Sequence, residues 1–419
     1  MKPLAQYSLF DPETLKCPYD FYRQLRAEAP VYQVPGLGLY LVSTYELIRE
    51  VVKNTSVWSS SVAAGIPPAA LSEPNGDVER RIAAIVRSDR ALEPTLLSVD
   101  PPDHAKHRTL VNKMFTASRV KTLVPYIDGV VAELIDSFID AGSVEFMSRF
   151  AAPLPLEIIR DQLGVPKADK EFFDRAAEAA AEVLSLTPPT PERALERAQL
   201  NHDLQIYFLE KCAERRREPR DDMLTILVES LYEGQRHLRD GEILSILQQF
   251  LVAGHETTTS ALGAGMRLLI EQPQQLARLV EDPSRIANFV EEVLRLESPV
   301  QGLMRIALQD TSLGGVELRK GSVIMLRYGA ANRDEAVFAD AERLDVCRDN
   351  ANRQLAFGSG VHACVGAPLA RQEMTSAFAA IIRRMKNFAF DPARPEPDND
   401  PSFLLRGLNN LYITFERAG

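Results

Sequence analysis

The residues best suited to chemistry surround one cysteine, Cys364, in a stretch that reads FGSGVHACVGAPLAR at residues 357–371. Three glycines flank this cysteine, and they let the backbone turn sharply and approach a flat ligand closely. Pro368 suits the first turn of a following helix, whose amide groups and dipole favour a thiolate over a thiol. Because a thiolate binds iron, the stretch predicts a cysteine ligand beside a flat, metal-containing group.

Cys364 has three alternative roles. A buried cysteine commonly packs as a small hydrophobic residue, but packing does not require three glycines beside it. A zinc site is disfavoured because no second cysteine lies within metal-ligand spacing. A nucleophilic cysteine paired with His362 stays open, although side chains two residues apart in a loop rarely meet.

A second chemical pattern, AGHETTT, interrupts the longest periodic segment, residues 242–269. Gly254 weakens a helix by about 1 kcal/mol relative to Ala, and threonine hydroxyls can bond back to the preceding turn. We therefore expect a local bulge or bend here. A structural kink is one reading. The other is that Glu256 and Thr257 deliver protons to dioxygen, which needs positioned side chains. His255 is assigned no role.

Both patterns resemble motifs of the cytochrome P-450 superfamily. The Cys364 stretch is similar to the family's FGxGxHxCxG loop, and the acid–alcohol pair is similar to its [AG]Gx[DE]TT helix. The resemblance implies that Cys364 is the axial thiolate ligand of a haem b iron. It implies that Thr257 hydrogen-bonds dioxygen and that Glu256 relays protons. It also implies four further cofactor contacts, which neutralise the haem propionates: His104, Arg108, Arg305 and His362.

The resemblance also points to a structural ion cluster. Glu292 and Arg295 lie three residues apart, on one helix face, and match the family's Glu-x-x-Arg pair. The family completes this pair with an arginine from a later segment. Arg343 is the best match for it, although the residues around Arg343 depart from the family pattern.

Composition bounds the fold. The 419 residues are 45% hydrophobic and 25% charged, which is typical of a globular protein with an ample core. Periodic patterns favour a mainly α protein, and the resemblance implies the P-450 fold, with a large helical domain and a smaller β-containing region. We expect one domain over residues 1–419. Helices are predicted at 17–29, 104–115, 118–141, 155–163, 168–184, 191–217 and 242–269, strands at 31–34 and 39–42, an irregular segment at 59–98, and a Pro-rich break at 185–190.

Charge and terminal sequence suggest partners and location. A net charge of −10 argues against nucleic acid. The N-terminal residues lack a signal peptide and the run of about 20 apolar residues that spans a membrane. The four cysteines are scattered along the chain, which fits a reducing cytoplasm. A monomer is also expected. The basic helix at residues 104–113, followed by Arg119 and Lys121, is either a solvated face or a docking face for an acidic ferredoxin.

The resemblance therefore implies a soluble bacterial monooxygenase. It would insert one oxygen atom from dioxygen into a hydrophobic small molecule, with electrons from NAD(P)H through a ferredoxin reductase and a ferredoxin. A peroxygenase that uses hydrogen peroxide and a non-catalytic haem sensor or carrier are the alternatives. The expected pocket walls are residues 59–98, the lid near Pro188, and residues 251–253, 300–304 and 403–405.

Overall fold

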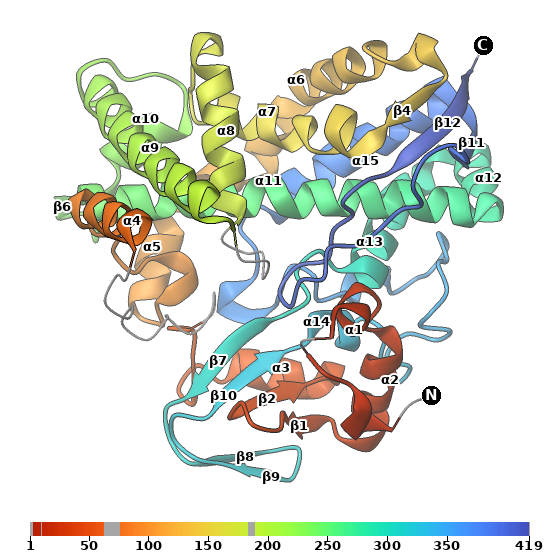
Figure 1. The fold of residues 1–419 in the computed structure, drawn as a ribbon, viewed down its shortest axis with the longest axis horizontal. Helices are drawn as coiled ribbons and strands as arrows, with labels where there is room; N and C mark the ends of the chain where they lie inside the picture. Colours follow the sequence, from red (N-terminus) through yellow and green to blue (C-terminus); the bar gives the residue numbers. More distant parts are fainter. Residues whose placement is uncertain (1–2, 10, 63–75, 183–188, 419) are drawn as a thin grey trace.

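The computed structural model describes residues 3–9, 11–62, 76–182 and 189–418. Figure 1 shows a large helical region above a smaller region that contains the main β-sheet. The mainly α fold predicted from the sequence is confirmed, as is the smaller β-containing region. Within the described residues, no helix is long and apolar enough to cross a membrane.

Helix α11 (Asp240–Glu271) runs through the centre of the helical region (Figure 1). Its residues 258–266 are all buried, as expected for a helix that is apolar or small on every side. A side chain at position 265 would clash with the ring of Phe378, which packs directly against Gly265. Phe378 belongs to α15 (Ala367–Arg384), so this close packing holds α15 against α11. The central helix therefore positions the helix that follows the Cys364 stretch.

The predicted bulge in this central helix is wrong. The α-helix runs unbroken from Asp240 to Glu271, through the AGHETTT sequence. The expected back-bond is nevertheless present, because the Thr257 hydroxyl donates to the Ala253 carbonyl over 2.7 Å. Dense packing on both sides of α11 outweighs the weak helix propensity of one glycine and three threonines.

Most other predicted elements are confirmed. The helix predicted at 191–217 has these bounds in the structure, and the strands at 31–34 and 39–42 form an antiparallel hairpin. The irregular reading of residues 59–98 missed a helix of 12 residues, and residues 63–75 and 183–188 of the predicted loops lie outside the described residues. The helices that match predictions are α2 (Tyr19–Glu28), α5 (Asp103–Asn112), α6 (Ala117–Asp136), α7 (Pro153–Gln162), α8 (Lys170–Ala181) and α9 (Pro191–Arg217).

The main sheet has the strand order β1-β2-β10-β7-β3. β10 pairs with β2 in parallel and with β7 in antiparallel orientation, so Arg305 in β7 faces Ile324 of β10 across the ladder. The strands are β1 (Val31–Gln33), β2 (Leu39–Val42), β3 (Trp58–Ser59), β7 (Leu303–Ala307) and β10 (Val323–Leu326); a second sheet joins β4 (Ser143–Glu145), β11 (Met385–Phe390) and β12 (Tyr412–Arg417).

The remaining elements complete the frame. They are α1 (Pro12–Lys16), α3 (Tyr45–Lys53), α4 (Asp77–Ser88), α10 (Met223–Glu229), α12 (Pro273–Glu281), α13 (Ile286–Glu297) and α14 (Tyr328–Ala331), with the hairpins β5 (Leu231–Tyr232) with β6 (Arg236–His237) and β8 (Thr311–Leu313) with β9 (Val316–Leu318).

The hydrophobic interior divides into one large helical core and two smaller cores around the main sheet. The Cys364 stretch lies between them. Phe357 and Val365 pack against the helical core, whereas Gly360 lies against the Val52 carbonyl of the sheet region, where a Cβ atom would approach that oxygen to 2.6 Å. The Cys364 stretch therefore joins the two parts of the fold.

The ion cluster forms with a different third member. Arg295 Nε and Glu292 Oε1 are 2.5 Å apart, and both side chains are fully buried. The second arginine on this carboxylate is Arg348, whose Nε lies 3.1 Å from Glu292 Oε1. Arg343 is exposed and contributes only its backbone carbonyl, which accepts from Arg295. The expectation for Arg343 is therefore wrong, and its motif match failed because the later segment is irregular.

Candidate active site

The Cys364 stretch folds as a tight turn that leads into α15. Gly358 and Gly360 have φ angles of 66° and 73°, a region that favours glycine. The Cys364 amide donates to the Phe357 carbonyl over 2.8 Å, and α15 begins at Ala367. The predicted helix start after the cysteine is therefore present.

Cys364 combines an accessible side chain with a deep position. Its side chain is exposed, yet burial raises the pKa of its thiol. The exposed surface therefore faces a space inside the protein rather than bulk water. The amides of Gly366 and Ala367 and the charges of Arg108 and Arg371 oppose the burial effect. These groups support a thiolate as the sequence predicted, but a bound metal cation is needed to complete deprotonation.

Arg371 fastens the Cys364 stretch to the neighbouring helix α13. Its Nε lies 2.5 Å from Glu291 Oε1, and Nη2 donates to the other oxygen over 3.1 Å. The guanidinium also covers the ring of Phe357, at 4.6 Å from the ring centroid. A bidentate pair with a stacked aromatic ring fixes the stretch more firmly than a single ion pair would.

The four predicted propionate contacts gather in one region. His104 and Arg108 come from α5, Arg305 comes from β7, and His362 lies in the Cys364 stretch. The rings of His104 and His362 have centroids 4.1 Å apart. Burial, followed by the neighbouring His104, Arg305 and Arg108, lowers the pKa of His362 to about 3. The His362 ring is therefore neutral near pH 7.

Asp100 also lies in this region, and the sequence did not predict it. Asp100 accepts a hydrogen bond from the Ser60 amide over 2.7 Å and one from the Ser59 hydroxyl over 2.5 Å. Its charge favours the protonated forms of His104 and His362. A lone aspartate before two prolines carries no sequence signal for such a role.

The acid–alcohol pair lies on α11. Ala253 is exposed in the middle of this mostly buried helix, and Glu256 and Thr257 are half-buried. Burial, and then the charge of Asp400, raises the pKa of Glu256. Within the part of the chain that the structure describes, no hydrogen bond joins either residue of the pair to Cys364.

A neighbouring contact links the two helices instead. The Thr258 hydroxyl bonds the carboxyl of Glu373 on α15, and burial raises the pKa of Glu373 to about 8. The helix that carries the acid–alcohol pair and the helix that follows the Cys364 turn are therefore joined by a buried, protonated carboxyl group.

The site fits a haem in three respects. Cys364 presents an accessible sulfur atom to an internal space. Two guanidinium and two imidazole groups meet the need of two propionates for cationic and hydrogen-bonding partners. The buried Nε2 atom of His362 has no hydrogen-bond partner among the described residues, so a propionate oxygen would satisfy it. The fold and this site define a haem-thiolate protein.

Comparison with known proteins establishes the family. The family model "Cytochrome P450" matches residues 167–414. The chain is 34% identical over 406 residues to 6-deoxyerythronolide B hydroxylase of Saccharopolyspora erythraea, covering 95% of this chain and 96% of that protein. It is 33% identical over 408 residues to cytochrome P450 107B1 of the same organism, covering 96% of both. The chain belongs to the cytochrome P450 family.

Solved structures agree with this assignment. Substrate-free CYP150A6 of Mycobacterium marinum has a TM-score of 0.84 and 33% identity, with 99% of this chain and 100% of that chain covered. CYP109Q5 of Chondromyces apiculatus has a TM-score of 0.85 and 31% identity, with 99% of both chains covered. This protein is a P450 monooxygenase, an oxidoreductase with a haem iron that is ligated by a thiolate.

Proposed function

We propose that this monooxygenase hydroxylates or epoxidises a hydrophobic small molecule, with electrons from NAD(P)H through a ferredoxin reductase and a ferredoxin. When bound, haem b supplies the iron centre that activates dioxygen. The observation that carries the proposal is the accessible Cys364 sulfur in its glycine-rich turn, together with an intact acid–alcohol pair on α11. The turn alone fits a haem carrier, whereas the pair supports catalysis.

Cys364 is the proposed axial ligand, and four residues around it hold the propionates. Arg108 and Arg305 supply positive charge, and the neutral rings of His104 and His362 donate hydrogen bonds. The gathering of these side chains from α5, β7 and the Cys364 stretch supports this assignment.

Glu256 and Thr257 are the proposed proton-delivering groups. Inserting one atom of dioxygen and reducing the other to water consumes two protons and two electrons in each turnover. The Thr257 hydroxyl is fixed by its bond to the Ala253 carbonyl and can hold a hydrogen bond at the accessible face of α11. The raised pKa of Glu256 suits a group that must accept and release protons near neutral pH.

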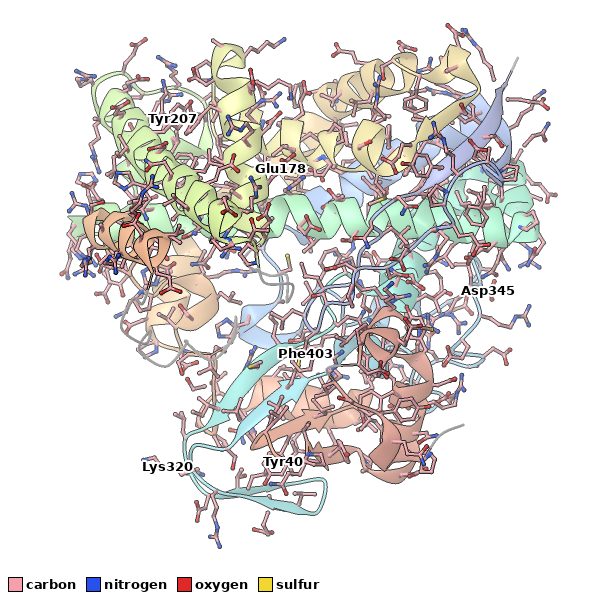
Figure 2. All side chains as sticks on the ribbon, in the orientation of Figure 1. Tyr40, Glu178, Tyr207, Lys320, Asp345 and Phe403 are labelled. Carbon is pink, nitrogen blue, oxygen red and sulfur yellow. The ribbon has the colours of Figure 1, made fainter. Side chains whose placement is uncertain are left out.

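The substrate pocket is proposed between the β7 segment and a C-terminal loop. Gln301 donates its backbone amide to the Leu404 carbonyl over 2.7 Å, and Val300 bridges Leu405. Figure 2 shows Phe403 beside β7 and β10. Pro188 lies outside the described residues, so the lid expectation rests on the sequence alone. The apolar walls favour a hydrophobic ligand.

The proposed ferredoxin site is the basic face around α5. Lys106 is paired with Asp103 and Glu233, and Arg119 is paired with Asp221. The exposed Lys113 has no ion-pair partner among the described residues, and Lys121 on α6 is exposed as well. Because Arg108 is assigned to the propionates, Lys113 and Lys121 supply the charge that would steer an acidic partner. We also propose a cytoplasmic monomer of one domain, and sedimentation velocity tests its monomeric state.

Reconstituted turnover tests the proposal. The protein, a bacterial ferredoxin, its reductase and NADPH are incubated under ¹⁸O₂ with corticosterone, 6-deoxyerythronolide B and a fatty acid. Relatives with those names or bound ligands justify the first two compounds. Product that carries one ¹⁸O atom supports the proposal. Turnover with hydrogen peroxide alone would establish a peroxygenase, and substrate-induced spectral shifts without product from either system would indicate a sensor or carrier.

A further inference from the structure

The surroundings of Glu256 contain a second carboxyl group. Glu256 has no hydrogen-bond or ion-pair partner within residues 3–9, 11–62, 76–182 and 189–418. The charged group that acts on it is Asp400, which comes from a segment 144 positions further along the chain. An acid beside an acid without a shared cation is a costly arrangement, and such pairs cluster at functional sites.

Asp400 belongs to a short hairpin, residues 398–409, which we name the C-terminal hairpin. Asn399 and Leu408 form an antiparallel bridge, and the Asp400 amide donates to the Gly407 carbonyl over 3.1 Å. The Asn409 amide closes the base by donating to the Asp398 carbonyl over 2.8 Å. These backbone bonds fix where Asp400 can lie.

The C-terminal hairpin is held along α11 at two places. Gly407 lies against Ser260, where a Cβ atom on the glycine would come within 2.7 Å of the hydroxyl oxygen. Arg267 donates to the Asn399 side chain over 3.1 Å. Ser260 follows Glu256 by one helical turn, so it lies on the same face of α11. The backbone bond between Asp400 and Gly407 therefore brings Asp400 to the Glu256 face.

Asp400 also lacks a basic partner. Its carboxyl has no ion pair within the described structure, because the nearby Lys16 pairs with Asp398 at 2.9 Å instead. Burial and the charge of Asp398 raise the pKa of Asp400, while Lys16 lowers it. Asp400 and Asp398 are both half-buried. The described residues contain no group of acids, histidines and cysteines arranged to hold a metal ion.

We propose that Asp400 is the immediate proton donor to Glu256, and that it carries protons from solvent to the acid–alcohol pair. This inference rests on the proposed function of Glu256. In each transfer, protonated Asp400 loses its proton and the Glu256 carboxylate gains it. Solvent then reprotonates Asp400. No electron moves in this step, and the charge on the pair is unchanged until solvent supplies the next proton.

Three variants in the reconstituted system test the proton route. Asp400→Asn keeps the shape but cannot transfer a proton, so product formed per NADPH should fall by about tenfold or more. Asp400→Glu restores a carboxyl and should recover most of that yield. Glu396→Gln is the matched control, because Glu396 is an exposed acid four residues before Asp400, and its yield should stay within about twofold of the parent.

A spectroscopic titration gives a readout that does not depend on turnover. The carboxyl band of Glu256 is identified by infrared difference spectroscopy as the band that Glu256→Gln removes. Because Asp400 carries the like charge that opposes ionisation of Glu256, Asp400→Asn should move the Glu256 titration to lower pH. A residue that only shaped the hairpin would leave that titration in place.

The outcomes separate this inference from the proposed function. If Glu256→Gln lowers product per NADPH but Asp400→Asn does not, Asp400 is not the donor and the role of Glu256 stands. If Glu256→Gln itself leaves the yield unchanged, the proton role of Glu256 fails and this inference fails with it. A loss of yield in Asp400→Asn without any shift of the Glu256 titration would also overturn the pairing.

Discussion

Arg348 Nε lies 3.1 Å from Glu292 Oε1, at a carboxylate that Arg295 also contacts. Arg295 donates further to the carbonyls of Asn332, Ala341 and Arg343, and so satisfies its buried N–H groups. The cluster fastens α13 to the irregular segment that precedes the Cys364 stretch. Arg348 also donates to the carbonyls of Ala339 and Arg343, so removing it leaves these acceptors and one side of the Glu292 carboxylate without a partner.

Arg348→Ala should therefore lower the free energy of unfolding by about 1 to 3 kcal/mol. Arg343→Ala is the matched control, since the exposed Arg343 side chain takes no part in the cluster, and it should change stability by less than about 0.5 kcal/mol. Urea unfolding followed by circular dichroism measures both. Equal losses in the two variants would contradict the cluster as described.

Cys364→Ala should abolish monooxygenase activity and the red-shifted ferrous–CO absorption that thiolate ligation gives. Haem binding itself should weaken less, because the propionate contacts stay in place. Cys17→Ala is the control, since Cys17 is an exposed free cysteine far along the chain from the site. A Cys364→Ala protein that kept the red-shifted band would rule out this cysteine as the ligand.

Thr257→Val should lower product per NAD(P)H by about tenfold or more, because a proton-delivering hydroxyl is replaced by a methyl group of the same size. NAD(P)H consumption should continue, with reduced oxygen species released instead of product. Thr259→Val is the matched control on the same helix. The Thr259 hydroxyl is buried without a partner among the described side chains, so its loss should be neutral or slightly stabilising. Unchanged product yield in Thr257→Val would show that the Thr257 hydroxyl is not needed for proton delivery.

His255 should make the protein sensitive to acid. Burial lowers the pKa of His255 to about 4, although Asp174 and the Ala152 carbonyl partly oppose this. In the unfolded chain the pKa is about 6.5, so between these values the unfolded state binds the extra proton. The contribution of His255 to the free energy of unfolding is fully present above pH 6.5. It declines as the pH falls towards 4, by up to about 3 kcal/mol.

His255→Phe should therefore take up close to one proton fewer on unfolding between pH 6.5 and 4, so its free energy of unfolding should fall less steeply with pH. His237→Phe is the control, because His237 is exposed on β6. Unfolding free energies measured at several pH values test both variants. A pH slope in His255→Phe identical to that of the parent protein would show that His255 does not titrate on unfolding.

Sequence reasoning succeeded where a short stretch carries its own physical signal. The glycines and proline around Cys364 dictate a turn and a helix start, and both are present. Long amphipathic helices such as residues 191–217 can also be predicted, because their hydrophobic periodicity repeats over many turns.

The failures share one cause, which is dependence on the tertiary environment. The bulge in α11 was predicted from local propensity, and packing overrode it. Arg348 and Asp400 act through partners more than 50 residues away, on segments without regular periodicity. A single acid or arginine in an irregular segment carries no signal until the fold shows what it faces.

The Cys364 stretch touches the helical core through Phe357 and the sheet region through Gly360. A ribosome therefore releases most of both regions before the piece that locks them together emerges. The last contacts between the two regions can therefore form only after residue 371 has been made, when nearly nine-tenths of the chain is already synthesised.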